Sequence, residues 1–165
     1  MPEKKTIKAA RRDKRQGKAP STQAGEFVHE EIEHIRQGKH GARSTKQAIA
    51  IGLSKARRAG VKLKPPKKGR VSSKTRKNAQ RDYAKGQRHE PVSKTRSRAR
   101  VKALKREPRS TVSSKALSRQ AHSAAMKRTA SERSEAAKKA AKTKGPEERS
   151  EAAKKAAETR AEEQS

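Results

Sequence analysis

Large hydrophobic residues are concentrated in one part of the chain, residues 25–63, where they recur every three or four positions in two runs. The residues of these runs are Val28, Ile32 and Ile35, then Ile49, Leu53 and Ala56. A spacing of i, i+4 and i+7 places three side chains on one face of a helix. Two helices that each carry one such stripe can bury the stripes against each other. The pattern therefore predicts a helical hairpin.

Residues at the ends of the two runs are typical of helix termini. Gly38 follows the first run and is suited to the position just after a helix. Ser44 opens the second run with Gln47 three residues later, which is a capping-box pattern. Gly60 follows the second run, and the prolines at 65–66 prevent the helix from continuing.

The segments on either side of the hairpin are polar. Residues 1–24 are basic with a polar end, and we expect them to form a mobile, disordered arm. Residues 64–110 are rich in Lys and Arg and contain two candidate helices, at 73–85 and 93–106. The sequence thus places little apolar material outside the hairpin.

Residues 111–165 are rich in alanine and contain an internal repeat. The sequence of residues 132–144 recurs with two changes at 148–160. Alanine, lysine and glutamate favour helices, whereas Gly145-Pro146 between the copies favours a break. We expect two repeat helices that lack the large apolar residues of a coiled coil and are only partly formed in isolation.

The composition limits how much of this chain can fold. Ile, Leu, Val and Phe together account for 16 of 165 residues, and most of the remaining apolar residues are alanines. Burial of so little apolar area cannot offset the entropy lost by ordering every residue. We expect a mostly α protein: a small helical hairpin plus extended or isolated helices, with substantial disorder and no single large core.

The charge points to a partner. The net charge is +30, and 23 of the 47 bases lie between Ser44 and Ser110 with only three acids. A chain this basic repels itself unless it meets a polyanion, and nucleic acid is the commonest in a cell. The residues that we expect to neutralise phosphates form a dense run at the end of the second helix: Lys55, Arg57, Arg58, Lys62, Lys64, Lys67, Lys68 and Arg70.

The number of aromatic residues bears on which kind of nucleic acid the chain binds. The only aromatic residues are Phe27 and Tyr83, so the chain lacks the stacking platform of most single-strand binders. Contact with the backbone of duplex DNA, independent of sequence, is favoured, and structured or ribosomal RNA is the alternative.

The hairpin could also recognise bases as a helix-turn-helix, with suitable side chains near the start of its second helix, but no third helix is evident. Those side chains are Arg43, Ser44, Lys46 and Gln47. The hairpin could instead bind a protein partner.

Other function classes find no support in the sequence. There is no Cys, so disulfides and cysteine-ligated zinc are excluded. His29 and His34 are five residues apart and do not share a helix face, so we assign no metal ligand. We expect no enzyme activity, cofactor, signal peptide or membrane span, and a location in the cytoplasm at the nucleoid.

Residues 25–60 resemble a family of small basic bacterial proteins of unknown function that carry a similar KQAIAIGLSKAR core, here Lys46–Arg57. The resemblance implies a bacterial source and no established activity. The tail is similar in composition to bacterial histone H1-like proteins, although its acids depart from their nearly uniform basicity. The sequence therefore predicts a non-enzymatic, nucleoid-associated DNA-binding protein.

Overall fold

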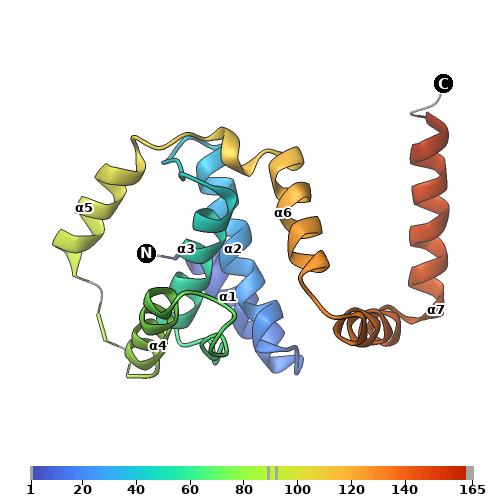
Figure 1. The fold of residues 1–165 in the computed structure, drawn as a ribbon, viewed down its shortest axis with the longest axis horizontal. Coiled ribbons are helices and arrows are strands. Elements are labelled where there is room, and N and C mark those ends of the chain that lie inside the picture. Colours follow the sequence, from blue (N-terminus) through green and yellow to red (C-terminus); the bar gives the residue numbers. More distant parts are fainter. Residues whose placement is uncertain (1, 89, 92, 163–165) are drawn as a thin grey trace. The chain divides into compact units, whose positions relative to one another are not determined.

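A computed structural model describes residues 2–88, 90–91 and 93–162. Every regular element among these residues is a helix, which confirms the mostly α expectation (Figure 1). The chain divides into two units, Met1–Gln120 and Ala121–Ser165. The elements are α1 (Lys4–Arg15), α2 (Pro20–Arg36), α3 (Thr45–Arg58), α4 (Ser73–Gln87), α5 (Lys94–Leu104), the 3-10 turn η1 (Ser110–Val112), α6 (Ser114–Met126) and α7 (Ala130–Glu162).

The predicted hairpin is present as α2 and α3. Gly38 and Gly60 follow these helices with φ of 76° and 90°, the left-handed conformation that glycine adopts without strain. The Ser44 hydroxyl accepts a hydrogen bond from the Gln47 backbone N–H at 3.2 Å, as the capping pattern predicts. Helix α2 begins at Pro20, before residue 25, where the hairpin was predicted to begin.

The prediction of a disordered arm in residues 1–24 is wrong for the part that forms α1 and the start of α2. Helix α1 packs against α2 and buries Thr6, Ala10 and Asp13, which follow one another at i, i+4 and i+7. Two of these residues are polar and the third is small, and Ile7 is the one large apolar residue of this helix. More generally, the substantial disorder expected of the chain is not confirmed.

Polar contacts hold the start of α1 against α2. The Glu3 carboxylate lies 2.8 Å from His34 Nε2 and 3.2 Å from Lys39 Nζ. Hydrogen bonds from His34, Lys5 and Lys39 lower the pKa of Glu3 from 4.5 to about 2. The carboxylate therefore stays ionised and binds cationic and polar groups of the hairpin at ordinary pH.

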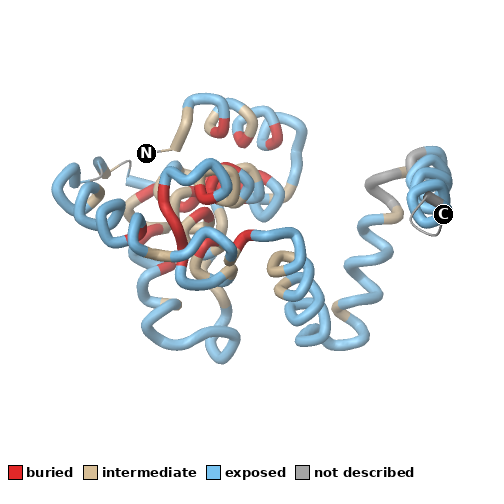
Figure 2. The backbone as a smooth tube through the Cα atoms, turned by 90° about the horizontal axis from the view of Figure 1, so that it is seen from above, coloured by how far each residue is buried: buried red, intermediate tan, exposed pale blue. Residues whose placement is uncertain are grey.

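Two small clusters replace a single large core, in line with the few apolar residues available (Figure 2). The first joins α1, α2, α3 and the residues after α3. Its buried members are Ala10, Ala24, Phe27, Ala56 and Val61. The second lies at the other end of the hairpin and consists of Ile35, Ala42, Ala48 and Val112.

Small residues allow the helices to pack closely. A Cβ atom at Gly52 of α3 would lie 2.6 Å from the Val28 Cα of α2. A Cβ atom at Gly86 of α4 would collide with the Arg57 carbonyl oxygen of α3. Helix α4 thus packs on α3 while α1 packs on α2. The candidate helices at 73–85 and 93–106 are confirmed as α4 and α5, whereas the sequence predicted neither α1 nor the packing of α1 and α4 on the hairpin.

The segment that follows α5 returns to the loop between α2 and α3. Backbone N–H groups of Gly41 and Ala42 donate to the carbonyls of Leu104 and Pro108 at 2.9 and 3.0 Å. The Thr45 hydroxyl donates to the Thr111 carbonyl at 2.6 Å. These bonds position the end of α5 beside the start of α3.

The unit formed by Ala121–Ser165 contains α7, which is two helices separated at Gly145, where φ is 68° and ψ is 169°. The predicted break between the two repeats is therefore confirmed. Those side chains of this unit whose burial is described are almost all exposed (Figure 2). No helix in the described parts of the chain combines the length and apolar character that a membrane crossing requires.

Candidate nucleic-acid interface

The chain that leaves α3 presents lysines outward because its apolar residues point inward. Val61 is buried, and Leu63 packs on the first core cluster. The Arg57 Nε–H donates to the Leu63 carbonyl at 3.2 Å and holds the segment against α3. In this extended stretch alternate side chains face opposite directions, so Lys62 and Lys64 are exposed.

Basic residues continue along the following loop and along α4. The sequence from Val61 to Arg81 contains nine Lys and Arg and no acid. Ser72 caps α4 by accepting a hydrogen bond from the Thr75 N–H at 3.2 Å. The buried face of α4 carries Ala79 and Asp82, which leaves its bases on the outer surface. Its exposed bases are Lys74, Lys77 and Arg81.

Three of the eight residues predicted to bind phosphate make contacts inside the fold. Lys55 Nζ forms ion pairs with Glu31 and Glu30 of α2. Arg57 is 7% exposed, and burial lowers the pKa of its guanidinium below the ordinary value, with the charge of Asp82 opposing the shift. Arg57 and Lys55 therefore support the helices that carry the exposed bases.

Arg58 is the third of these residues. Its Nη1 lies 3.4 Å from Asp82 Oδ1, and the Ser54 hydroxyl donates to Asp82 Oδ2 at 2.6 Å. This cluster joins α3 to α4. The other five predicted residues are exposed, and the structure brings them together in one loop: Lys62, Lys64, Lys67, Lys68 and Arg70.

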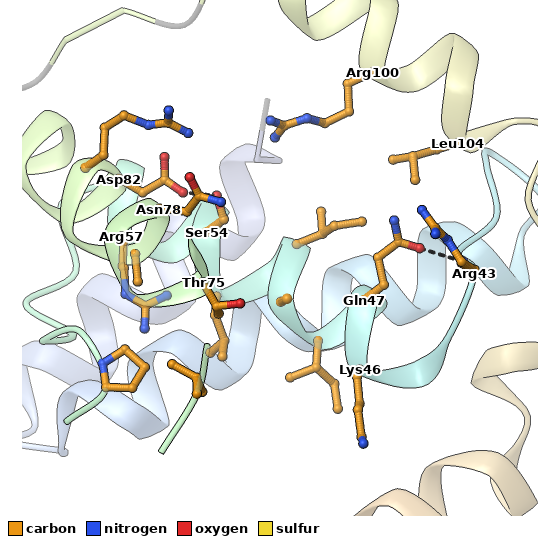
Figure 3. A pocket seen from close by; sticks show the side chains of 18 of the residues that line it. Arg43, Lys46, Gln47, Ser54, Arg57, Thr75, Asn78, Asp82, Arg100 and Leu104 are labelled. Carbon is orange, nitrogen blue, oxygen red and sulfur yellow. Dashed lines mark hydrogen bonds between the residues drawn. The ribbon is translucent and has the colours of Figure 1, made fainter. Parts of the chain in front are cut away.

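A groove of about 830 Å³ runs between α3, α4 and α5 (Figure 3). Its floor is the outer face of α3, which includes Ala50 and Ile51. Of its two acids, Asp82 is paired with Arg58, and Glu107 lies 3.9 Å from Arg43. The basic and amide side chains that line it are Arg43, Lys46, Gln47, Arg57, Asn78, Arg81, Arg100 and Gln120.

The start of α3 only partly fits base recognition. Ser44 and Gln47 are used to cap the helix, since the Gln47 side-chain oxygen also accepts from the Arg43 N–H at 2.6 Å. The side chains of Arg43 and Lys46 remain exposed. Two long, exposed basic side chains are suited to contact with phosphates.

The bases on α4 were not among the residues singled out from the sequence. Their location could have been inferred from Ser72 as a helix cap and from small or short residues at 79, 82 and 86, which mark the buried face. Lys55, Arg57 and Arg58, which were predicted to bind phosphate, are buried or half-buried. Their partners Glu31 and Asp82 lie 24 or more positions away along the chain, so no local pattern reveals them.

A family model described as a family of unknown function (DUF6496) matches residues 3–68 of the chain. The match spans α1, the hairpin and the start of the basic loop, which supports the resemblance to an uncharacterised family over this part. It ends before the alanine-rich tail and carries no information about an H1-like character there. No curated protein and no solved structure matches the chain significantly.

Proposed function

We propose that the protein binds duplex DNA with little dependence on sequence, through the basic surface formed by the loop after α3 and the outer face of α4. The observation that carries the proposal is the separation of charge in this region. Eight of the nine bases between Val61 and Arg81 are exposed, and that stretch contains no acid. A surface of one sign attracts a polyanion and releases its condensed counterions on contact.

The burial of acids strengthens this surface. The carboxylates of Glu30, Glu31 and Asp82 are buried or nearly so, and they pair with bases of the fold. They therefore do not neutralise the exposed bases. The protein acts by binding rather than by a reaction, and the nucleoid is the compartment where a duplex-binding protein of this kind would work.

The test is a binding titration with two unrelated duplexes of equal length at several salt concentrations. Ten phosphate contacts would give a slope of log K against log salt of about −9. The variant Lys64→Gln, Lys67→Gln, Lys68→Gln removes three exposed loop charges. We expect its slope to become less negative by about 3 and its affinity for both duplexes to fall equally.

A matched control removes the same charge elsewhere. Lys127→Gln, Lys138→Gln, Lys155→Gln changes three exposed lysines near or within the nearly neutral tail. We expect a wild-type slope for this variant. Equal effects of the two triple variants would contradict a localised surface, and a preference for one duplex by orders of magnitude would contradict sequence independence. Tighter binding to a structured RNA at the same salt concentration would overturn the choice of DNA.

A further inference from the structure

A carboxylate and two imidazoles meet toward the end of α2, and none of them belongs to the basic surface. Glu31 and His34 lie on one face of α2, three residues apart, and His40 lies in the loop that follows. Their ligand atoms all lie within 4.8 Å of one another. The left-handed Gly38 reverses the chain after α2 and allows His40 to return to the helix.

The Glu31 side chain is fully buried, and neither of its oxygens has a hydrogen-bond partner. His40 Nε2 lies 3.2 Å from Oε1, and Lys55 Nζ lies close to Oε2, but both at angles unsuited to a hydrogen bond. Burial of a carboxylate without hydrogen bonds is costly unless a cation compensates. Lys55 supplies one positive charge on the Oε2 side only.

The hydrogen bond made by His40 shows why its second nitrogen needs a cation. His40 Nδ1 lies 3.0 Å from the Gly41 carbonyl oxygen, which can only accept, so Nδ1 carries the proton. In a neutral imidazole Nε2 then carries a lone pair and lies 3.2 Å from Glu31 Oε1, so two acceptor atoms lie close together. Either a second proton or a metal ion at Nε2 removes this repulsion. An imidazole that donates Nδ1–H to a carbonyl is the usual arrangement of a histidine ligand.

His34 has a similar outer partner. Its Nε2 lies 2.8 Å from Glu3 Oε1, and its Nδ1 lies 3.9 Å from Glu30 Oε1. A carboxylate that accepts one ring N–H holds the imidazole in a fixed orientation. The rings of His34 and His40 are nearly perpendicular, with centroids 6.4 Å apart. The contact with Glu3 occupies Nε2 of His34 and leaves Nδ1 as the candidate ligand atom.

We propose that Glu31, His34 and His40 bind a divalent transition metal ion of the zinc type. Two imidazoles and one carboxylate are ligands that zinc uses in proteins. Ligand atoms about 2.0–2.1 Å from a tetrahedral ion lie about 3.4 Å apart, close to the 3.2 Å between His40 Nε2 and Glu31 Oε1. Lys55 stays with Oε2 as an outer partner, and the fourth position is open to water or to Glu30.

A metal ion here would link three parts of the fold. Glu31 and His34 belong to α2, His40 to the α2–α3 loop, and Glu3 connects His34 to the start of α1. Because an ion that binds only the folded state stabilises it, zinc should raise the urea concentration at which the protein unfolds. This effect is independent of nucleic-acid binding, so it can be measured whether or not the protein binds DNA.

The test is a titration of the full-length protein with Zn²⁺ and, separately, with Co²⁺. We expect saturation at one equivalent, an increase in the urea midpoint, and the visible absorption bands of tetrahedral Co²⁺. His40→Gln and His34→Gln should each weaken Zn²⁺ affinity at least about a hundredfold. The matched control is His29→Gln, because His29 is an exposed histidine of the same helix. We expect it to bind like the wild type.

Circular dichroism of each variant establishes that it folds before affinities are compared. No Zn²⁺ binding by the wild type would overturn the proposal. Equal affinity of the wild type and the His34→Gln, His40→Gln double variant would do the same, since the ion would then bind elsewhere. Loss of binding in His29→Gln would also contradict the assigned ligands.

Discussion

The contact between α2 and α3 predicts that one kind of substitution will have opposite effects at two glycines. Gly52→Ala adds a methyl group where α3 crosses α2, 2.6 Å from the Val28 Cα and 2.9 Å from the Phe27 carbonyl oxygen. Gly25→Ala adds the same group to α2 at a position with no other atom within 4 Å. The pair therefore compares the same chemical change with and without a close neighbour.

The magnitudes follow from these distances. Carbon atoms are at their optimal separation at about 3.5–4.0 Å, so Gly52→Ala has to push two backbones apart by about 1 Å. Overpacking of this kind costs about 1–3 kcal/mol. The upper half of the range applies because the two nearest atoms belong to the backbone and cannot move away by a change of rotamer. The higher helix propensity of alanine offsets about 1 kcal/mol of this cost, so the free energy of unfolding falls by a net amount of about 1–2 kcal/mol. Gly25→Ala should keep the propensity gain of about 0.5–1 kcal/mol.

Urea unfolding followed by tyrosine fluorescence measures both effects. Tyr83 on α4 is the only tyrosine and there is no tryptophan, so the signal reports on the unit that contains α3. With a slope of about 1–3 kcal/mol per molar urea, we expect the Gly52→Ala midpoint to fall by about 1 M and the Gly25→Ala midpoint to rise by about 0.5 M. A Gly52→Ala protein as stable as the wild type would refute the close crossing of α2 and α3.

Three further substitutions test which residues stabilise the fold and which only face the solvent. Lys55→Ala leaves the buried Glu31 without its lysine partner and should lower the free energy of unfolding by about 3–5 kcal/mol in urea, with an unchanged salt slope for DNA binding. Lys64→Ala should leave the free energy of unfolding unchanged and make the salt slope for DNA binding less negative. A loss of stability in this variant would contradict the exposed position of Lys64. Ser44→Ala removes the hydrogen bond to the Gln47 N–H and should cost about 1 kcal/mol in the same assay, whereas no loss would show that the cap does not stabilise α3.

Local patterns were sufficient for the helices whose signals lie within a few residues. The spacing of Val28, Ile32 and Ile35 predicted α2, and Ser44 with Gln47 predicted the start of α3. Helix α1 was missed because the residues it buries include a threonine and an aspartate. Asp13 is buried beside Lys18 of the loop that follows α1, and a hydrophobic pattern does not record such a partner.

The candidate sites show the same limit. The predicted basic run consists of exposed residues and of residues that make contacts inside the fold. The positions of Glu31 and Asp82 in space determine which of the bases belong to the second group. Local spacing was also insufficient for the histidines. It related His34 to His29, five residues before it, and not to His40. The turn at Gly38 brings His40 to the face of α2 that carries Glu31 and His34.

The sequence by itself determined the helical character, the hairpin, the break between the repeats, and an excess of positive charge too large to be neutralised within the chain. These properties depend on composition and on spacings of three or four residues. The tertiary structure decided which charges face solvent and which chemical groups meet. Burial of a charged side chain depends on a partner from another helix, and close packing at Gly52 and Gly86 sets where the helices, and therefore those partners, lie.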